Sequence, residues 1–210
     1  MMIGRMAAAA MAVLLFGLGS AGPARALSAD ERTQLAAIEK YVNSLTTVKT
    51  RFSQTAPNGQ SAKGMIYLQR PGKLRIDFDP PSDVQIITTR LWLVVYEGKN
   101  AEPQNYPLDS TPAGILVRKE IKFGGDLTVK SVRQEKGVVR VRLIRTRNPN
   151  QGSMTLIFGA EPMKLIGWIV ADAQNQRTIV RLSGTQVGVK LGPETFALRG
   201  RSVSTPGVER

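Results

Sequence analysis

The feature that most constrains the fold is a regular alternation of apolar and charged side chains near the end of the segment 64–81. Successive side chains of a β-strand point to opposite faces of a sheet, so this pattern predicts a strand with one dry and one wet face. An antiparallel sheet that covers a core on one side has this character. The dry parity is Leu74, Ile76 and Phe78, and the wet parity is Lys73, Arg75, Asp77 and Asp79.

A tight turn joins this strand to the one before it. Met65–Gln69 has the length and composition of a strand, and Arg70-Pro71-Gly72 follows it directly. Proline presets its φ and glycine accepts a positive φ, which suits both residues to a tight turn. We therefore expect a hairpin with Arg70 at its bend.

The first 26 residues have the character of a secretory signal peptide. Arg5 precedes a short apolar run, and Ala24-Arg25-Ala26 matches a cleavage signature. The run is shorter than the roughly 20 residues that a membrane anchor needs. We expect cleavage after Ala26 and an exported, soluble protein, with residues 27–210 forming one domain with a sizeable core.

Composition and charge narrow the range of functions. The chain contains no His and no Cys, which excludes His- or Cys-dependent catalysis, the commonest transition-metal ligands, and a lipid anchor on an N-terminal Cys. The net charge of +13 suits nucleic acid, an anionic membrane surface or an acidic partner, and export disfavours nucleic acid. Asp77 and Asp79 share a strand face and could form a hydrolase pair, but salt bridges to neighbouring basic residues explain them better.

The predicted helices are one long and one short. Ser28 and Glu31 have the spacing of a capping box, which predicts a helix over Ser28–Ser44. Thr111-Pro112 is a helix-start signal for a short helical segment over Ala113–Arg118. Gly114 weakens that segment, which makes it a candidate for a mobile lid.

Strand-length runs fill most of the remaining chain, and their short connections favour antiparallel neighbours. The polar segment 97–105 is interpreted as a loop. A second alternating segment repeats the apolar-in, basic-out pattern with Val139, Val141 and Leu143 against Arg140, Arg142 and nearby Arg145. The predicted class is mainly β (α+β), an incomplete antiparallel β-barrel of about ten to eleven strands with an N-terminal helix and a short helical lid.

The dry side of such a sheet either fills with its own side chains or encloses a cavity. A filled core is the ordinary outcome for an alternating sheet. Three features favour a cavity here: the weak covering helix, the export of the chain, and a positive charge suited to work near anionic lipid surfaces.

Several motifs together resemble the LolA-type periplasmic carriers, which move lipoproteins from the inner to the outer membrane of Gram-negative bacteria. The most specific is the Arg-Pro-x-x-x-Arg hairpin from Arg70 to Arg75, which follows a strand led by Gly64. The resemblance runs from about Leu35 to Phe196. The other matching pieces are Phe52-Ser53-Gln54, Leu91-Trp92, Thr111-Pro112 before Ile115-Leu116, and Asp172 ahead of Gln176-Arg177-Thr178.

The resemblance implies a non-enzymatic carrier, without metal or cofactor, that holds acyl chains inside the incomplete barrel. Arg70 would bind backbone carbonyl groups of the lid and act as its latch. The implied partners are lipid-modified proteins, an inner-membrane releasing transporter and an outer-membrane receptor, with peripheral membrane contact, no nucleic acid and a monomeric state in the periplasm. The expected ligand-binding side chains are Ile66, Leu68, Leu74, Ile76, Phe78, Trp92, Ile115 and Leu116.

Three departures from the family pattern predict a looser lid or a different lipid cargo. Ala113 and Gly114 follow Thr-Pro where bulky residues are common, Ile76 stands where Trp is common, and Thr89-Arg90 replaces an Asp-Gly turn. A periplasmic lipid-sensing regulatory domain of the same fold is the second hypothesis, and an exported hydrolase is the third.

Overall fold

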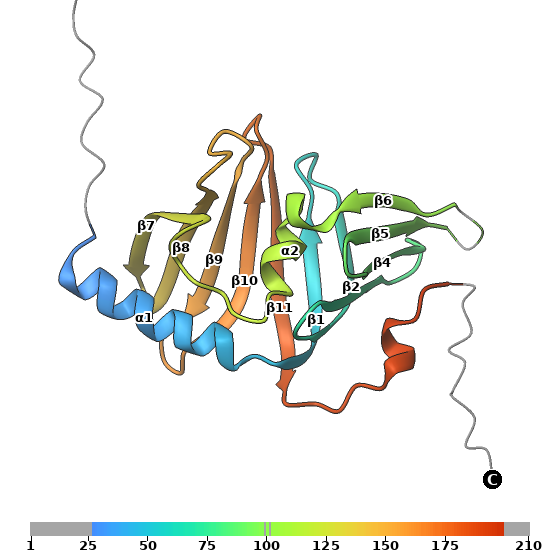
Figure 1. The fold of residues 1–210 in the computed structure, drawn as a ribbon, viewed down its shortest axis with the longest axis horizontal. Helices are drawn as coiled ribbons and strands as arrows, with labels where there is room; N and C mark the ends of the chain where they lie inside the picture. The colour runs from blue at the N-terminus through green and yellow to red at the C-terminus, as the bar shows by residue number, and fades with distance from the viewer. Residues whose placement is uncertain (1–26, 99, 101, 200–210) are drawn as a thin grey trace, which may run out of the picture.

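The computed structural model describes residues 27–98, 100 and 102–199, so the predicted signal peptide, 1–26, lies outside the described residues. In this part of the chain, one antiparallel sheet of eleven strands has the order β6-β5-β4-β3-β2-β1-β11-β10-β9-β8-β7. The sheet curves without closing, and β6 and β7 are its two edges (Figure 1). The prediction of a mainly β, incomplete barrel is confirmed.

The elements lie close to the predicted segments. The strands are β1 (Thr47–Thr55), β2 (Ser61–Gln69), β3 (Lys73–Phe78), β4 (Val84–Thr88), β5 (Trp92–Glu97), β6 (Gln104–Pro107), β7 (Leu127–Glu135), β8 (Val138–Arg145), β9 (Ser153–Gly159), β10 (Lys164–Ala171) and β11 (Arg177–Val187). The helices are α1 (Ala29–Ser44) and α2 (Pro112–Leu116), with 3-10 turns η1 (Leu108–Ser110) and η2 (Pro193–Phe196).

Strand β6 begins inside the segment that was predicted to be a loop. It pairs with β5 through Trp92↔Pro107 and Leu93↔Tyr106. All four of its residues are exposed, so the strand carries no alternation of buried and exposed positions. The prediction was wrong at Gln104 and Asn105. The segment has no local strand pattern and is a strand because it pairs with β5.

Helix α1 begins with the predicted capping box. The Glu31 amide donates to Ser28 Oγ at 3.1 Å, and the Ser28 amide donates to Glu31 Oε2 at 2.7 Å. Its buried residues, Leu35, Ile38 and Val42, join one apolar cluster with side chains of β7, β8 and β9. The helix therefore covers this half of the sheet on the same side as α2 (Figure 1).

Strands β2 and β3 form the predicted hairpin. Ile66 faces Ile76 and Leu68 faces Leu74 across the ladder. These residues belong to a second apolar cluster, which also contains side chains of β1, β11 and the segment around α2. The dry face of the hairpin is thus the face that the helices cover, which we call the concave face.

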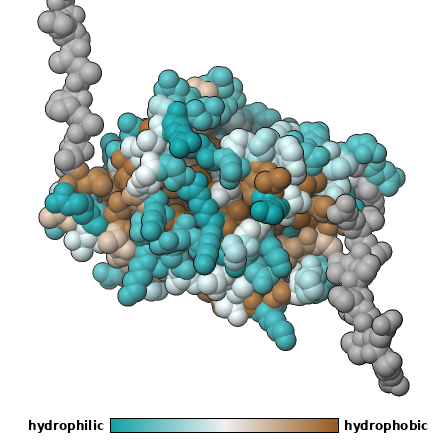
Figure 2. Space-filling view, viewed as in Figure 1, coloured by the Kyte–Doolittle hydropathy of each residue, from teal (hydrophilic) through white to brown (hydrophobic). Residues whose placement is uncertain are grey.

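The surface on the helix side is mostly hydrophilic. Apolar patches show between the hydrophilic side chains near the middle of this face (Figure 2). Within the described residues, neither α1 nor any other helix is long and apolar enough to cross a membrane.

Candidate functional site

A short helix, α2, lies over the concave face and is the predicted lid. Thr111 is its N-cap, and the Gly114 amide donates to the Thr111 hydroxyl at 3.4 Å. Pro112 occupies the first turn, where its missing N–H costs nothing. The helical segment is therefore confirmed, although it ends at Leu116 rather than at Arg118.

Gly114 has a packing role in the lid that its low helix propensity does not reveal. A Cβ at this position would collide with the backbone carbonyl oxygen of Leu108 in η1. Gly114 is buried, and η1 leads directly into α2. The glycine therefore allows the lid to pack closely against the turn that precedes it.

Arg70 joins the hairpin turn to both helices. Its Nε donates to the carbonyl oxygen of Leu116 at 2.8 Å, and its Nη1 donates to the carbonyl oxygen of Val42 at 2.6 Å. The backbone reinforces the contact, because the Gly72 amide donates to the carbonyl oxygen of Val117 at 2.7 Å. Arg70 thus satisfies carbonyl groups at the C-terminal ends of α1 and α2, where helices leave them without intrahelical partners.

The Arg70 guanidinium is partly withdrawn from water. Burial lowers its pKa well below the usual arginine value, to about 10, so the side chain still carries its charge at neutral pH. A buried charge is costly unless its donors are paired, and the two carbonyl bonds provide that pairing. Helix α2 is consequently held in place by polar bonds that partly offset a desolvation cost.

An apolar pocket, which we call the inner pocket, lies on the concave face under Arg70 and Leu116. Its volume in this closed arrangement is about 50 Å³, which holds at most a few water molecules. The lining side chains come from α1, β1, β2, β3, the lid, β10 and β11. They are Tyr41, Leu45, Val48, Thr50, Ile66, Leu68, Arg70, Leu74, Leu116, Leu165, Trp168, Leu182 and Thr185.

The structure brings most of the predicted ligand-binding residues to the concave face. Four of them line the inner pocket: Ile66, Leu68, Leu74 and Leu116. Ile76 and Phe78 pack against the same apolar cluster from β3. Ile115 is buried in the cluster of α1, β7, β8 and β9 and lines a separate pocket of about 450 Å³.

The prediction that Trp92 lines the cavity is wrong. Its neighbour Leu93 packs against the concave cluster, so Trp92 points to the opposite, convex face. Its side chain is 44% exposed. The same parity of β5 supplies Val94 and Tyr96 to a separate convex cluster with Ile87 and Leu198.

Two groups of concave residues were missed from the sequence. Trp168 and Leu165 of β10 line the inner pocket. β10 is apolar on both parities and has an irregular register between Leu165 and Gly167, so its sequence did not show which residues face the pocket. Arg145 was grouped with outward basic residues, yet it has the parity of the buried Val141 and Leu143. Its Nη2 donates to the carbonyl oxygen of Thr111 at 2.8 Å.

The carboxylates of the convex face form salt bridges rather than a catalytic pair. Asp77 lies 2.8 Å from Arg75 Nε, and Asp79 lies 2.5 Å from Arg51 Nη2 across the sheet. These ion pairs agree with the interpretation made from strand parity. Within the described residues, no group of three or more Asp, Glu, His or Cys side chains is arranged to hold a metal ion.

Comparison with known proteins identifies the family. The family model of the outer membrane lipoprotein carrier protein LolA matches residues 43–199. The chain belongs to the LolA family. It is therefore a member of a family of non-enzymatic, periplasmic lipoprotein carriers, as the hairpin motif indicated.

This LolA-family protein resembles two curated relatives, and the first of them is itself a lipoprotein carrier. It is 27% identical over 175 residues to an outer-membrane lipoprotein carrier protein of Methylococcus capsulatus, covering 79% of this chain and 83% of the relative. It is 20% identical over 127 residues to an uncharacterized protein of Rickettsia prowazekii, covering 60% of each chain.

A solved structure shares the fold at low identity. A DUF1329 family protein from Desulfovibrio piger matches with a TM-score of 0.50 and 10% identity, over 78% of this chain and 95% of the other. A LolA superfamily protein from Nitrosomonas europaea matches with a TM-score of 0.47 and 12% identity, over 78% of this chain and 97% of the other. At 10% identity, the likeness to the Desulfovibrio piger protein is evidence for the fold alone.

Proposed function

We propose that this LolA-family carrier binds the acyl chains of lipoproteins on its concave face and carries them from the inner to the outer membrane. The observation that supports the proposal is the position of Arg70. A charged latch sits at the mouth of an apolar pocket and holds a lid of only five residues by a backbone carbonyl. This arrangement can open without disturbing the sheet.

Acyl chains and the lid compete for the same surface. Each buried CH₂ group gains about 0.8 kcal/mol, so a lipid tail has a strong tendency to enter an apolar site. The closed inner pocket of about 50 Å³ is too small for such a chain. Cargo therefore enters as Leu116 and the lid withdraws, and acyl contacts replace lid contacts with a small net change in free energy.

The balance between the two states makes release feasible. A carrier that bound acyl chains with their full transfer free energy would not give them up at its destination. Reclosure of the lid on Arg70 recovers the bond to the Leu116 carbonyl, the backbone bond from Gly72 to Val117 and the apolar contacts of Leu116. Opening and closing therefore differ by a few interactions that a partner protein can shift.

The route requires two membrane partners, which we propose to be an inner-membrane releasing transporter and an outer-membrane receptor. The carrier is exported with cleavage after Ala26 and acts as a monomer in the periplasm. Cleavage removes Arg5 and Arg25 and lowers the net charge from +13 to +11, which suits brief contact with anionic membrane surfaces on both sides of that compartment.

Mass spectrometry of the carrier purified from periplasm tests the proposal directly. We expect co-purified lipoprotein that carries acyl chains, and transfer of this cargo to vesicles that contain the outer-membrane receptor. Preparations that never contain lipoprotein or lipid, together with no uptake of a synthetic triacylated lipopeptide, would overturn it.

A further inference from the structure

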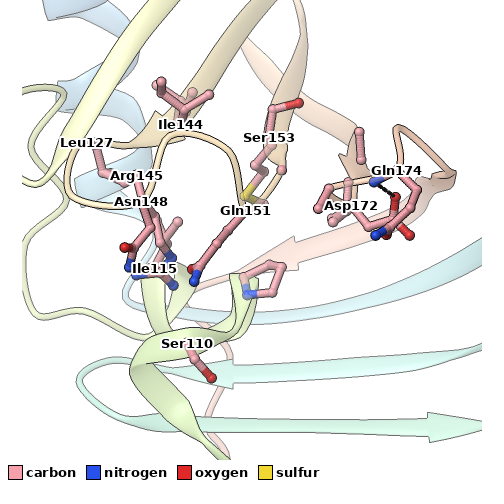
Figure 3. Close-up of a pocket in the computed structure, with 17 residues that line it drawn as sticks. Ser110, Ile115, Leu127, Ile144, Arg145, Asn148, Gln151, Ser153, Asp172 and Gln174 are labelled. Atoms are coloured by element: carbon pink, nitrogen blue, oxygen red, sulfur yellow. Dashed lines mark hydrogen bonds between the residues drawn. The ribbon is translucent and has the colours of Figure 1, made fainter.

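The concave face contains a second pocket on the other side of the lid. It has a volume of about 450 Å³, within the range of about 300–1,000 Å³ that is typical of small-molecule sites. It lies between the start of the lid, the end of β8 and the start of β9, and the end of β10 (Figure 3). Its apolar walls include Leu127, Leu143, Met154 and Val170.

The lid separates this second pocket from the inner pocket. Ile115 lines the second pocket and its neighbour Leu116 lines the inner pocket, and the two pockets have no lining residue in common. One helix of five residues thus presents consecutive apolar side chains to two compartments. Movement of the lid would change access to both.

A second arginine holds the lid on the side of the second pocket. Arg145 lines the pocket, and its Nη2 donates to the carbonyl oxygen of Thr111, the N-cap of the lid, at 2.8 Å. Arg70 binds Leu116 at the other end of the same helix. The two arginines come from opposite halves of the sheet, β8 and the β2–β3 turn, so the lid is tied at both ends.

The Arg145 side chain is paired with the lid rather than with an acid. Asp126, the nearby carboxylate, forms its ion pair with Arg118 at 2.5 Å, and the described residues provide no ion pair for Arg145. Burial lowers the pKa of Arg145, and the positive charge of Arg118 acts in the same direction, while the carboxylates of Asp109 and Asp126 act against them. The carbonyl of Thr111 is therefore an important partner for a partly desolvated cation.

We propose that the second pocket is a separate acyl compartment and that Arg145 is the latch that controls it. This inference rests on the proposed function and adds that different acyl chains of one cargo lie on different sides of the lid. When the lid moves, Arg145 can exchange the Thr111 carbonyl for an ester or amide carbonyl at the head of the acyl chain. Figure 3 shows Asn148 beside Arg145, where its amide can assist that exchange.

The exchange explains why an arginine suits this position. A cation that lost its carbonyl without replacement would remain partly buried and unpaired, which is unfavourable. A lipid carbonyl has the same acceptor chemistry as the backbone carbonyl, so opening to admit an acyl chain avoids that penalty. Hydrocarbon alone would not provide an acceptor, so the pocket favours a chain with a carbonyl head over plain alkane.

Photo-crosslinking of the full mature carrier tests the proposal. The probe is a synthetic tripalmitoylated lipopeptide with a diazirine at the end of its acyl chains, and labelled positions are mapped by mass spectrometry. In the wild-type protein we expect labels on Met154 or Val170 in the second pocket and on Trp168 or Leu182 in the inner pocket. Val170→Trp, which fills the second pocket, should remove the first set and leave the second.

Arg145→Met tests the latch, and Arg142→Met is the matched control. Arg142 lies on the same strand, is exposed on the convex face and loses the same charge. For Arg145→Met we expect hydrogen exchange at the Gly114 amide to rise by at least about tenfold, with altered labelling of the second pocket only. For Arg142→Met we expect both measurements to match the wild type.

The outcomes separate the two proposals. Labels confined to the inner pocket in the wild type would overturn the second compartment and leave the carrier function standing. An Arg145→Met variant that matches Arg142→Met in exchange and labelling would overturn the latch. The absence of labels in both pockets would overturn the compartment and the proposed acyl binding together.

Discussion

Arg70 Nε donates a 2.8 Å hydrogen bond to the carbonyl oxygen of Leu116, which lies 46 residues further along the chain. The bond connects the bend of the β2–β3 hairpin to the last residue of the lid. Because the lid is a helix of five residues, it is too short to be stable by itself, and such tertiary bonds hold it in place.

The first prediction concerns this bond. Arg70→Leu should favour the open lid, since it removes the charge-assisted bond to the Leu116 carbonyl, worth about 1.5–3 kcal/mol. We expect hydrogen exchange at the Val117 amide, which donates to the carbonyl of Ala113, to accelerate by at least about tenfold. Transfer of cargo to the outer-membrane receptor should change as well.

Arg70→Lys is the control for this substitution, because lysine keeps the charge and loses the planar fork of donors. It should give an intermediate exchange rate. Cargo transfer by Arg70→Leu at the wild-type rate would count against Arg70 as a latch.

The second prediction uses the two faces of the sheet. Ile76→Glu should abolish binding of a triacylated lipopeptide, because it places a carboxylate among apolar side chains of the concave cluster. Ile76 is only half-buried, so the fold should survive with a reduced melting temperature. Binding is measured by fluorescence of a labelled lipopeptide and stability by thermal unfolding.

Trp92→Glu is the matched control for Ile76→Glu. It introduces the same charge at an exposed position of the convex face, so we expect lipopeptide binding and stability to remain close to the wild type. Global unfolding of Ile76→Glu would indicate that this face is an ordinary filled core. Equal loss of binding in both variants would show that the effect of the charge does not depend on the face of the sheet on which it is placed.

The third prediction separates helix propensity from packing in the lid. Alanine is a better helix former than glycine by about 1 kcal/mol, so propensity alone predicts that Gly114→Ala strengthens the lid. The Cβ would collide with the carbonyl oxygen of Leu108, and we therefore expect the opposite result: faster exchange of the lid amides and a lower melting temperature. Gly124→Ala, where a Cβ meets nothing, is the control. A more protected lid in Gly114→Ala would contradict the packing role.

The fourth prediction is a pH dependence. Burial lowers the pKa of Arg70 in the folded chain to about 10, which opens an interval between this value and the higher pKa of the unfolded chain. Below that interval both the folded and unfolded chains keep the proton, and within it the unfolded chain binds more protons, so Arg70 makes stability rise with pH there. The unfolding free energy of the wild type relative to Arg70→Met should be constant up to about pH 9. Above that pH it should rise, so that the wild type gains stability relative to the variant. Denaturant titrations at a series of pH values measure this free-energy difference. A loss of wild-type stability relative to the variant above pH 9 would contradict the prediction.

Much of the fold follows from local patterns. The parity of Leu74, Ile76 and Phe78 assigns a face to β3 because side-chain direction in a strand repeats every two residues. The spacing of Ser28 and Glu31 specifies the start of α1 for a similar reason, since a capping box lies within one turn. These patterns need no knowledge of what the element packs against.

Other features depend on which surfaces meet. Strand β5 is apolar on both parities, so its sequence cannot say which face is concave. Contact of Leu198 with Val94 and Tyr96 covers the convex side of β5 and leaves Trp92 at its exposed end. Strand β6 is likewise a strand only through its pairing with β5.

Arg70 and Arg145 show the same difference between what local sequence patterns predict and what long-range packing decides. The sequence alone placed Arg70 at a hairpin bend and suggested, through its motif, that it binds the lid. Arg145 was interpreted as an outward residue, and no local pattern indicated its partner, because the carbonyl of Thr111 lies 34 residues away in the chain. Turn chemistry and strand parity are short-range properties of the chain, whereas the carbonyl that a buried cation finds depends on long-range packing of the lid between the two halves of the sheet.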